Sequence, residues 1–323
     1  MPVNVAFVGA GGNNSDHMSK VAANPDAEIC AVCDLDETKA QSAAEEHGVR
    51  AFADQDEMIS AVDIDAAFVS VPPFAHGDIE MALAEAGINM LVEKPVALDL
   101  ELARDIQAAI EDNDLVSTAG FQDRYLDVID RMQVALKEND PGVMLGYWMG
   151  GMPGVAWWRV KEQSGGQHVE QTIHTFDTAR YLFGEVASVH AVSSTGLMTE
   201  VPNYSVEDAS AVNLQFESGL CGTILSACFL NVGQQNGMEI WCKDLKIDYV
   251  ERTSVQFSHS GGDREFYTVK NDPRVNLDET FIEAVAKKDQ SLLKSSYADA
   301  VDTLEVVLAA SESMETGEAV EIG

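Results

Sequence analysis

Two short stretches of the chain carry side chains suited to moving a proton. The first is Glu93-Lys94-Pro95, in which a lysine directly follows a predicted strand. Pro95 fixes the backbone and biases Lys94 toward an extended conformation. The amine can then bind a substrate hydroxyl or take its proton. The alternative interpretation is a Glu–Lys pair of structural value only.

The second stretch runs from Gly165 to Asp177 and contains Glu170, His174 and Asp177. At helical spacing these three side chains share one face. A carboxylate beside an imidazole raises its basicity, which suits a general base. Three interpretations compete: a proton relay, a metal site built from Glu170, His174 and His168, and a solvated polar face. The spacing places His168 and His174 on different faces, which disfavours the metal.

The elements that must position these groups begin at the N-terminus. The apolar run Val3–Val8 predicts a buried strand, and a helix is expected from Ser15. Between them lies a turn in which glycine N–H groups and the helix N-terminus can hold a pyrophosphate. The residues of this turn are Gly9, Ala10, Gly11, Gly12, Asn13 and Asn14. Asn14 stands where a third glycine is usual, and asparagine tolerates left-handed backbone geometry. The alternative is an ordinary strand-to-helix turn.

Asp34 ends a second predicted strand, Glu28–Asp34. A carboxylate at this point can accept both ribose hydroxyls of an adenosine. It repels a 2′-phosphate, and Leu35 offers that phosphate no partner, so the pattern favours NAD over NADP, with NADP possible. The alternative role for Asp34 is a helix N-cap, which Asp36 can fill instead.

Helical and strand patterns alternate up to residue 122, which predicts βαβ units and a parallel sheet. Ligands of such sheets bind beyond the carboxyl ends of the strands. Besides the glycine turn and Asp34, those ends carry Ser70, Val71, Pro72, Glu93, Lys94 and Gln122, with His76 shortly after.

The pattern changes after Gln122. A linking helix over 123–137 is expected, followed by long alternating runs that predict a second, largely antiparallel sheet. One helix, Gln167–Phe183, interrupts these strands, and two more helices follow over 277–286 and 298–315. The two patterns divide the chain into domains 1–122 and 123–323.

The charge of the chain is strongly one-sided. Acidic residues outnumber basic ones 54 to 20, giving a formal net charge of −34 at ordinary hydrophobic content. Such a field repels nucleic acid and anionic membranes. We expect a protein that works in concentrated salt, where screening removes the self-repulsion. An acidic protein of an ordinary environment is the alternative.

Five cysteines show no disulfide framework. Cys30 and Cys33 form a C-x-x-C, but in a strand their side chains point to opposite faces, so core thiols are favoured over a redox pair. Free thiols suit a reducing cytoplasm. No apolar run of about 20 residues predicts a membrane helix, and no secretory signal is visible.

Taken together, the motifs resemble the Gfo/Idh/MocA oxidoreductase family over nearly the whole chain. The matching pieces, in order, are Gly9-x-Gly11 with His17, Asp34, Val71-Pro72-Pro73 with His76, Glu93-Lys94-Pro95, Gly120-Phe121-Gln122-x-Arg124-Tyr125, Trp157-Trp158-Arg159, and Gly165-Gly166 leading to His174-x-x-Asp177. Glu170 falls where the family usually has aspartate, and Thr172 replaces a common glycine.

The resemblance implies a fold of α/β class. Its parts are an N-terminal Rossmann domain with a doubly wound parallel sheet and a C-terminal α+β domain with a large, open, mainly antiparallel sheet. It also implies homodimers or homotetramers built through that second sheet.

The resemblance further implies an NAD(P)-dependent dehydrogenase acting on a carbinol carbon of a sugar or cyclic polyol. No metal is expected, because the histidine spacing disfavours one. Lys94 and His174 match the catalytic lysine and histidine, and Glu170 supports them. The residues expected to bind substrate are Lys94, Arg124, Trp158, Arg159, His174 and Asp177. Core and rim packing is the alternative for the tryptophans and Arg159. Two other functions stay open: an NAD-dependent glycosidase or lyase with a transient oxidation, and a non-catalytic NAD sensor.

Overall fold

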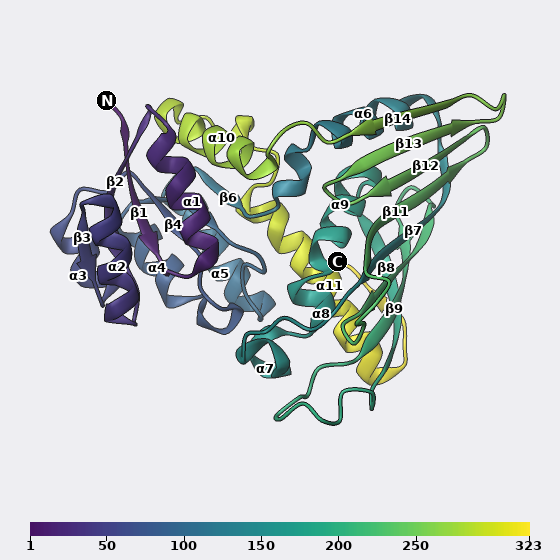
Figure 1. The fold of residues 1–323 in the computed structure, drawn as a ribbon, viewed down its shortest axis with the longest axis horizontal. Coiled ribbons are helices and arrows are strands. Elements are labelled where there is room, and N and C mark those ends of the chain that lie inside the picture. The colour runs from purple at the N-terminus through teal and green to yellow at the C-terminus, as the bar shows by residue number, and fades with distance from the viewer. The chain divides into compact units, whose positions relative to one another are not determined.

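The computed structural model describes residues 1–323 and divides into two compact units. The first comprises Met1–Gln122 and Asp272–Val301, and the second comprises Asp123–Asn271 and Asp302–Gly323. Each unit is built around one sheet (Figure 1).

The first unit contains a six-stranded, wholly parallel sheet in the order β3-β2-β1-β4-β5-β6. This is the doubly wound order that the family resemblance implies, and the parallel pairing confirms the alternating pattern. Its strands are short and apolar, and most of their residues are buried, as expected for a sheet covered on both faces. They are β1 (Val3–Val8), β2 (Ala27–Cys33), β3 (Arg50–Phe52), β4 (Ala66–Val69), β5 (Asn89–Val92) and β6 (Ser117–Ala119).

Helices connect these strands, and aspartate side chains cap several of them. Asp36, Asp54 and Asp99 each accept hydrogen bonds from backbone N–H groups in the first turn of the helix that follows. The helices are α1 (Gly12–Ala23), α2 (Glu37–His47), α3 (Gln55–Ala61), the 3₁₀ turn η1 (Pro73–Ala75), α4 (Asp78–Glu85) and α5 (Leu100–Asp112). β3 and α3 are only three and seven residues long and are not predicted from the sequence.

The first unit also includes residues 272–301, which the sequence analysis placed in the second domain. This segment forms α10 (Pro273–Lys287), the 3₁₀ turn η4 (Gln290–Leu292) and the start of α11 (Tyr297–Thr316). Phe281 of α10 is fully buried, with its ring edge-on to Phe68 of β4 at 5.5 Å. The apolar face of α10 therefore completes the core of the parallel sheet, and the expected domain boundary is wrong for this segment.

The second unit contains a nine-stranded sheet in the order β14-β13-β12-β11-β7-β10-β9-β8-β15. Every adjacent pair is antiparallel except β7 and β10. The strands are β7 (Pro141–Met149), β8 (Val186–Ser194), β9 (Ala209–Phe216), β10 (Cys221–Ala227), β11 (Gln235–Cys242), β12 (Leu245–Val250), β13 (Ser254–His259), β14 (Arg264–Thr268) and β15 (Val320–Glu321). Of these, β12 and β15 were not predicted.

Helices of the second unit pack on one face of its sheet (Figure 1). A Cβ at Gly146 of β7 would lie 2.7 Å from the Thr175 methyl group, so glycine lets α9 approach the sheet closely. These helices are η2 (Gln122–Tyr125), α6 (Asp127–Glu138), η3 (Trp157–Arg159), α7 (Lys161–Ser164), α8 (Gln167–Glu170), α9 (Ile173–Phe183) and the end of α11. The opposite face of the sheet carries a groove of about 300 Å³ whose lining includes His190, Asn213 and Thr223.

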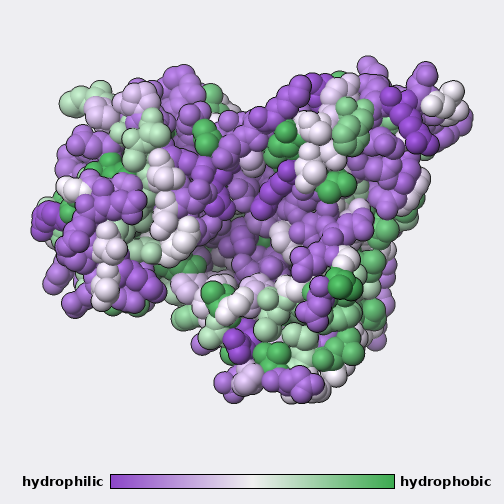
Figure 2. Space-filling model, in the orientation of Figure 1, coloured by the Kyte–Doolittle hydropathy of each residue, from purple (hydrophilic) through white to green (hydrophobic).

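The surface and the thiols match the composition. Hydrophilic residues cover most of the face shown in Figure 2. All five cysteines are free, and Cys33 is buried while Cys30 is half-buried. No helix has both the length and the apolar character needed to cross a membrane.

Candidate active site

The glycine turn after β1 is shaped by close backbone packing. Gly9 has φ +89°, and a Cβ there would collide with the Ser70 carbonyl that follows β4. Helix α1 begins at Gly12, and no side chain caps its N-terminus. The first N–H groups of α1 are thus left for an anion, as a pyrophosphate site requires.

Asn14 plays a different role from the expected one. It lies inside α1, is fully buried, and its Nδ2 donates to the carbonyl oxygens of Val8 (2.9 Å) and Gly9 (2.6 Å). The helix starts three residues earlier than predicted, so no left-handed asparagine is needed. Asn13 Nδ2 donates to Ser70 Oγ at 3.3 Å and ties the turn to the end of β4.

Asp34 is held against the glycine turn. Its Oδ2 accepts from the Ala10 N–H at 2.7 Å and its Oδ1 from the Asp36 N–H at 2.8 Å. Asp36 caps α2, as the sequence analysis allowed. Leu35 is 92% exposed and places no cation near this carboxylate. The geometry suits an acceptor for ribose hydroxyls.

His76 follows β4 in the chain, a few residues after Val71 and Pro72. Its Nδ1 is 2.7 Å from Glu80 Oε1, and Glu80 Oε2 accepts from the Gly77 N–H. The His76 Nε2 atom is buried and has no hydrogen-bond partner. An unsatisfied buried nitrogen next to a strand end marks a place where a ligand can complete the hydrogen bonding.

Glu93 sits on a buried ionic network. His17 Nε2 lies 3.2 Å from Glu93 Oε1, and His17 Nδ1 lies 2.8 Å from both Asp278 oxygens. A Cβ at Gly120 would be 2.7 Å from the Glu93 carboxyl carbon, so the neighbouring backbone must be glycine. Asp278 was not identified from the sequence, because it lies far along the chain on α10.

The charges of His17 and Glu93 stabilise each other, whereas burial raises the pKa of Asp278. Burial alone would lower the pKa of His17, but the carboxylates of Asp278 and Glu93 outweigh it and raise that pKa to about 9. Burial would raise the pKa of Glu93, but the His17 imidazolium lowers it to about 2. Glu93 is therefore a fixed anion next to Lys94.

Lys94 is half-buried, and its backbone N–H donates to Glu93 Oε2 at 3.3 Å. The Lys94–Pro95 peptide bond is cis. Gln122 is buried, and its Oε1 accepts from Arg274 Nε at 3.2 Å. Arg274, like Asp278, comes from α10 and was missed.

In the second unit, Glu170 and His174 do not share one continuous helix. Helix α8 ends at Glu170, and α9 starts at Ile173. Across the break, the Thr172 N–H donates to the Gln167 carbonyl, five residues back. The expected single helix 167–183, with three side chains on one face, is therefore wrong. Glu170 Oε2 instead accepts from Trp158 Nε1 at 2.8 Å.

Arg124 and Asp177 form an ion pair with each other. Both are buried, and the guanidinium contacts the carboxylate through Nε (3.1 and 3.0 Å) and Nη2 (2.7 Å). The guanidinium also stacks on the Tyr181 ring at 4.7 Å. This arrangement favours a structural ion pair over the expected contacts with substrate.

Trp158 is also a core residue. It is fully buried and packs with Val206 and Cys228. This is the packing alternative, so substrate contact through an open Trp158 ring is not supported. Arg159 is half-buried, and its Nε has no hydrogen-bond partner. His168 bonds to Glu207 and Ser311 within the unit.

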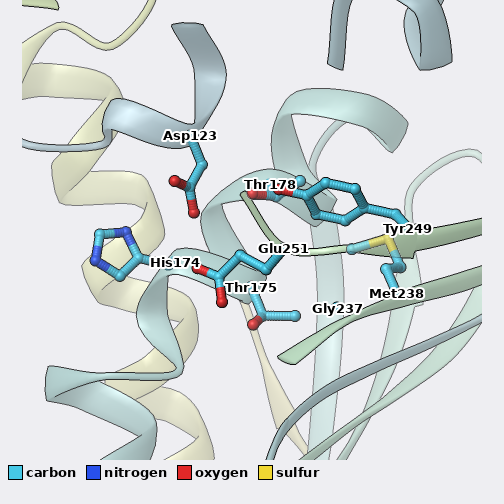
Figure 3. A pocket seen from close by; sticks show the side chains of 8 residues that line it. All are labelled: Asp123, His174, Thr175, Thr178, Gly237, Met238, Tyr249 and Glu251. Carbon is cyan, nitrogen blue, oxygen red and sulfur yellow. The ribbon is translucent and has the colours of Figure 1, made fainter. Parts of the chain in front are cut away.

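His174 lines a small cavity in the second unit, about 10 Å³ in volume. Around it lie Asp123, Thr175, Thr178, Gly237, Met238, Tyr249 and Glu251 (Figure 3). Arg252 Nε donates to Asp123 Oδ1 at 2.6 Å. Sequence reasoning missed Asp123 and Glu251, since nothing in a loop after β12 signals nearness to α9. No group of three or more His, Cys, Asp or Glu side chains is arranged to hold a metal.

Comparison with known proteins decides the family. Residues 3–121 match the GFO_IDH_MocA oxidoreductase family with its NAD-binding Rossmann fold, and residues 143–248 match the GFO/IDH/MocA C-terminal domain. The D-glucoside 3-dehydrogenase of Escherichia coli is 30% identical over 268 residues, which cover 75% of each chain. The chain belongs to the Gfo/Idh/MocA oxidoreductase family.

Other relatives agree. The inositol 2-dehydrogenase of Rhizobium meliloti is 27% identical over 299 residues, 89% of this chain and 90% of that one. Levoglucosan dehydrogenase in complex with NADH has the same fold, with a TM-score of 0.88, 20% identity and full coverage of both chains. An oxidoreductase from Agrobacterium radiobacter, with 17% identity, superposes with a TM-score of 0.89 over 100% of this chain and 99% of that one.

This Gfo/Idh/MocA protein is an NAD(P)-dependent oxidoreductase, and the described residues of the first unit fit the cofactor. The uncapped α1 N-terminus and the unsatisfied His76 nitrogen are features that a bound dinucleotide would use.

Proposed function

We propose that the protein oxidises a carbinol carbon of a sugar or cyclic polyol, with NAD as the preferred cofactor. The observation that carries the proposal is the placement of two residues in a chain of this family. Lys94 follows β5 and is adjacent to the ionised Glu93, and His174 lies in the first turn of α9. The D-glucoside and inositol dehydrogenases among its relatives support the substrate class.

The chain's own residues hold the cofactor in this proposal. The glycine turn and α1 bind the pyrophosphate, Asp34 the adenosine ribose, and Ser70, Val71, Pro72, His76 and Gln122 line the rest of the strand ends. When bound, the nicotinamide accepts or returns a hydride. A clear kinetic preference for NADP would contradict the role of Asp34.

Lys94 and His174 act on the reacting hydroxyl in this proposal. His174 accepts the hydroxyl proton, and Lys94 holds the oxygen and shares that proton. Glu93 keeps an anion next to the amine. Glu170 acts indirectly. It accepts a hydrogen bond from Trp158, which fixes the end of α8 just before the turn that leads to His174.

A reaction without net oxidation is the second candidate. It is favoured by relatives such as the 2,7-anhydro-N-acetylneuraminate hydratase of Escherichia coli, 24% identical over 229 residues. In that case the oxidised intermediate would undergo elimination and then be reduced again. Product release without NADH would identify this course.

The test is a panel of aldoses, inositols and amino sugars with NAD and NADP in molar KCl, followed by Lys94→Ala and His174→Ala. We expect each substitution to lower kcat by about 10²–10⁴-fold, as for loss of a general acid or base, with NAD binding retained. The exposed Lys137→Ala and His259→Ala serve as controls. Unchanged turnover in both site variants would reject the roles.

We also propose that the protein is cytoplasmic, works in concentrated salt and forms a homodimer or homotetramer through the second sheet. The free thiols, the net charge of −34 and the groove beside β8–β10 support these three points in turn. Light scattering after size exclusion measures the oligomer, and a monomer at all salt concentrations would exclude it.

A further inference from the structure

The cavity beside His174 contains an acidic pair that the proposed reaction does not yet use. Glu251 lies in the turn between β12 and β13, where its N–H donates to the Asn236 carbonyl at 3.0 Å. Its side chain is 9% exposed, and its Oε1 makes no hydrogen bond, although it forms an ion pair with Arg252 Nη2 at 3.4 Å. Figure 3 shows the Glu251 carboxyl group directed toward the side of the cavity where Asp123 and His174 lie.

The cavity is large enough for about one water molecule. Its volume of about 10 Å³ is at the lower limit for a single water, which needs two to four polar partners. The polar residues that line the cavity and could supply them are Asp123, Glu251, His174, Thr175 and Thr178. A single water in this place would join the imidazole to the acidic pair by hydrogen bonds.

We propose that Glu251 is a positioning residue that exchanges a proton with His174 across this cavity. The proposal rests on the proposed dehydrogenase function. In alcohol oxidation, the substrate hydroxyl loses its proton to His174, and the hydride leaves the carbon for the cofactor. The imidazolium then passes a proton through water to the ionised Glu251 carboxylate, which becomes a neutral acid. In carbonyl reduction, the neutral acid returns the proton.

The surroundings of Glu251 hold its proton near neutral pH. Burial and then the Asp123 charge raise the pKa of Glu251 to about 8, against the opposing guanidinium of Arg252, which lies 3.4 Å from Oε1. Asn236 on β11 is neutral. Burial also raises the pKa of Tyr249 on β12, so that phenol stays neutral. His174 is the remaining titratable group around the cavity.

Two variants test the exchange, with Glu239→Gln as a matched control, because Glu239 pairs with Lys246 on the same sheet, outside the cavity lining. The substrate is the fastest polyol of the panel. We expect Glu251→Gln to lower kcat about tenfold at pH 8 and to abolish a break in the kcat–pH profile near pH 8. Asp123→Asn should move that break to lower pH, because it removes the charge that holds the proton on Glu251. A purely structural role would not move it.

A titration of the ¹³C-carboxyl signals of the NAD-free protein measures the same proton without substrate. A signal with a midpoint near pH 8 should be lost in Glu251→Gln and retained in Glu239→Gln. Absence of that signal, or a kcat–pH break unchanged in both cavity variants, would overturn the proposal. If the signal is present but no polyol is oxidised, the proposed function fails, and the exchange fails with it.

Discussion

Each unit buries a pair of carboxyl groups beside a histidine, and the pKa of Glu93 in the first pair shifts in the opposite direction from the pKa of Glu251 in the second. In the first unit, the His17 imidazole lies between Glu93 and Asp278 and bonds to both. In the second, Glu251 and Asp123 adjoin directly, and the guanidinium of Arg252 contacts mainly Asp123. The position of the cation decides the outcome: Glu93 is held ionised with a pKa of about 2, whereas the pKa of Glu251 rises to about 8.

The difference matches two chemical tasks. A permanently ionised Glu93 provides a constant field for the adjacent Lys94. A carboxyl group that titrates near neutral pH suits the exchange of protons during a reaction. The same residue types thus produce a fixed charge in one unit and a titratable one in the other.

The largest expected effect comes from removing the cation in the first unit. His17→Leu leaves Glu93 and Asp278 buried without their shared partner, so the free energy of unfolding should fall by about 3–5 kcal/mol at pH 7. Glu251→Gln should not lower it, because Glu251 is already neutral in the folded protein at that pH, whereas the unfolded chain gains from ionising it. Urea unfolding measures both, with His259→Leu at an exposed site as control. Equal losses in the two variants would show that the two acid pairs do not differ as argued.

His17 and Glu251 should affect the free energy of unfolding over different pH ranges. The folded protein binds the His17 proton more tightly than the unfolded chain, so this contribution is full below about pH 6.5 and is lost as pH rises to about 9. Glu251 also binds its proton more tightly when folded, so its contribution is full below about pH 4.5 and is lost by about pH 8.

Differences between wild type and variants from pH 4.5 to 9.5 therefore test each group. The slope between pH 8 and 9 should diminish in His17→Leu and persist in Glu251→Gln. The slope between pH 4.5 and 6.5 should diminish in Glu251→Gln and persist in His17→Leu. A slope unaffected by either substitution in its own window would contradict the assigned proton affinity.

The fold of the first unit could be largely predicted, because its signals are local. Buried runs such as Ala66–Val69, the caps Asp36 and Asp99, and the glycine turn each fix a structure over a few residues. The assignment of α10 could not be predicted, because its apolar face is compatible with either sheet. Only the packing of Phe281 against Phe68 shows which core it completes.

The sequence proposes candidate site residues only where a local pattern marks them. Lys94 and Asp34 are proposed because they follow strand ends, and His174 because of its spacing from Glu170 and Asp177. The partners that set the charges were not identified, because Asp278 and Glu251 contact residues far away in sequence. Arg124 and Asp177 looked available for substrate, since a sequence does not reveal that two polar side chains bind each other.

Salt should have a small effect on the difference between the two acid pairs and a larger effect on the stability of the whole protein. Raising KCl from 0.1 to 1 M shortens the Debye length from about 10 to 3 Å and screens the exposed acidic residues. Thermal melts of the wild type should therefore shift upward, and equal stability in dilute buffer and molar KCl would reject adaptation to salt. The unfolding differences caused by His17→Leu and Glu251→Gln should change by less than about 0.5 kcal/mol, because both groups are buried. If salt changed the unfolding difference of either variant by more than this, the substituted group would be accessible to solvent ions. It would then not belong to a buried pair.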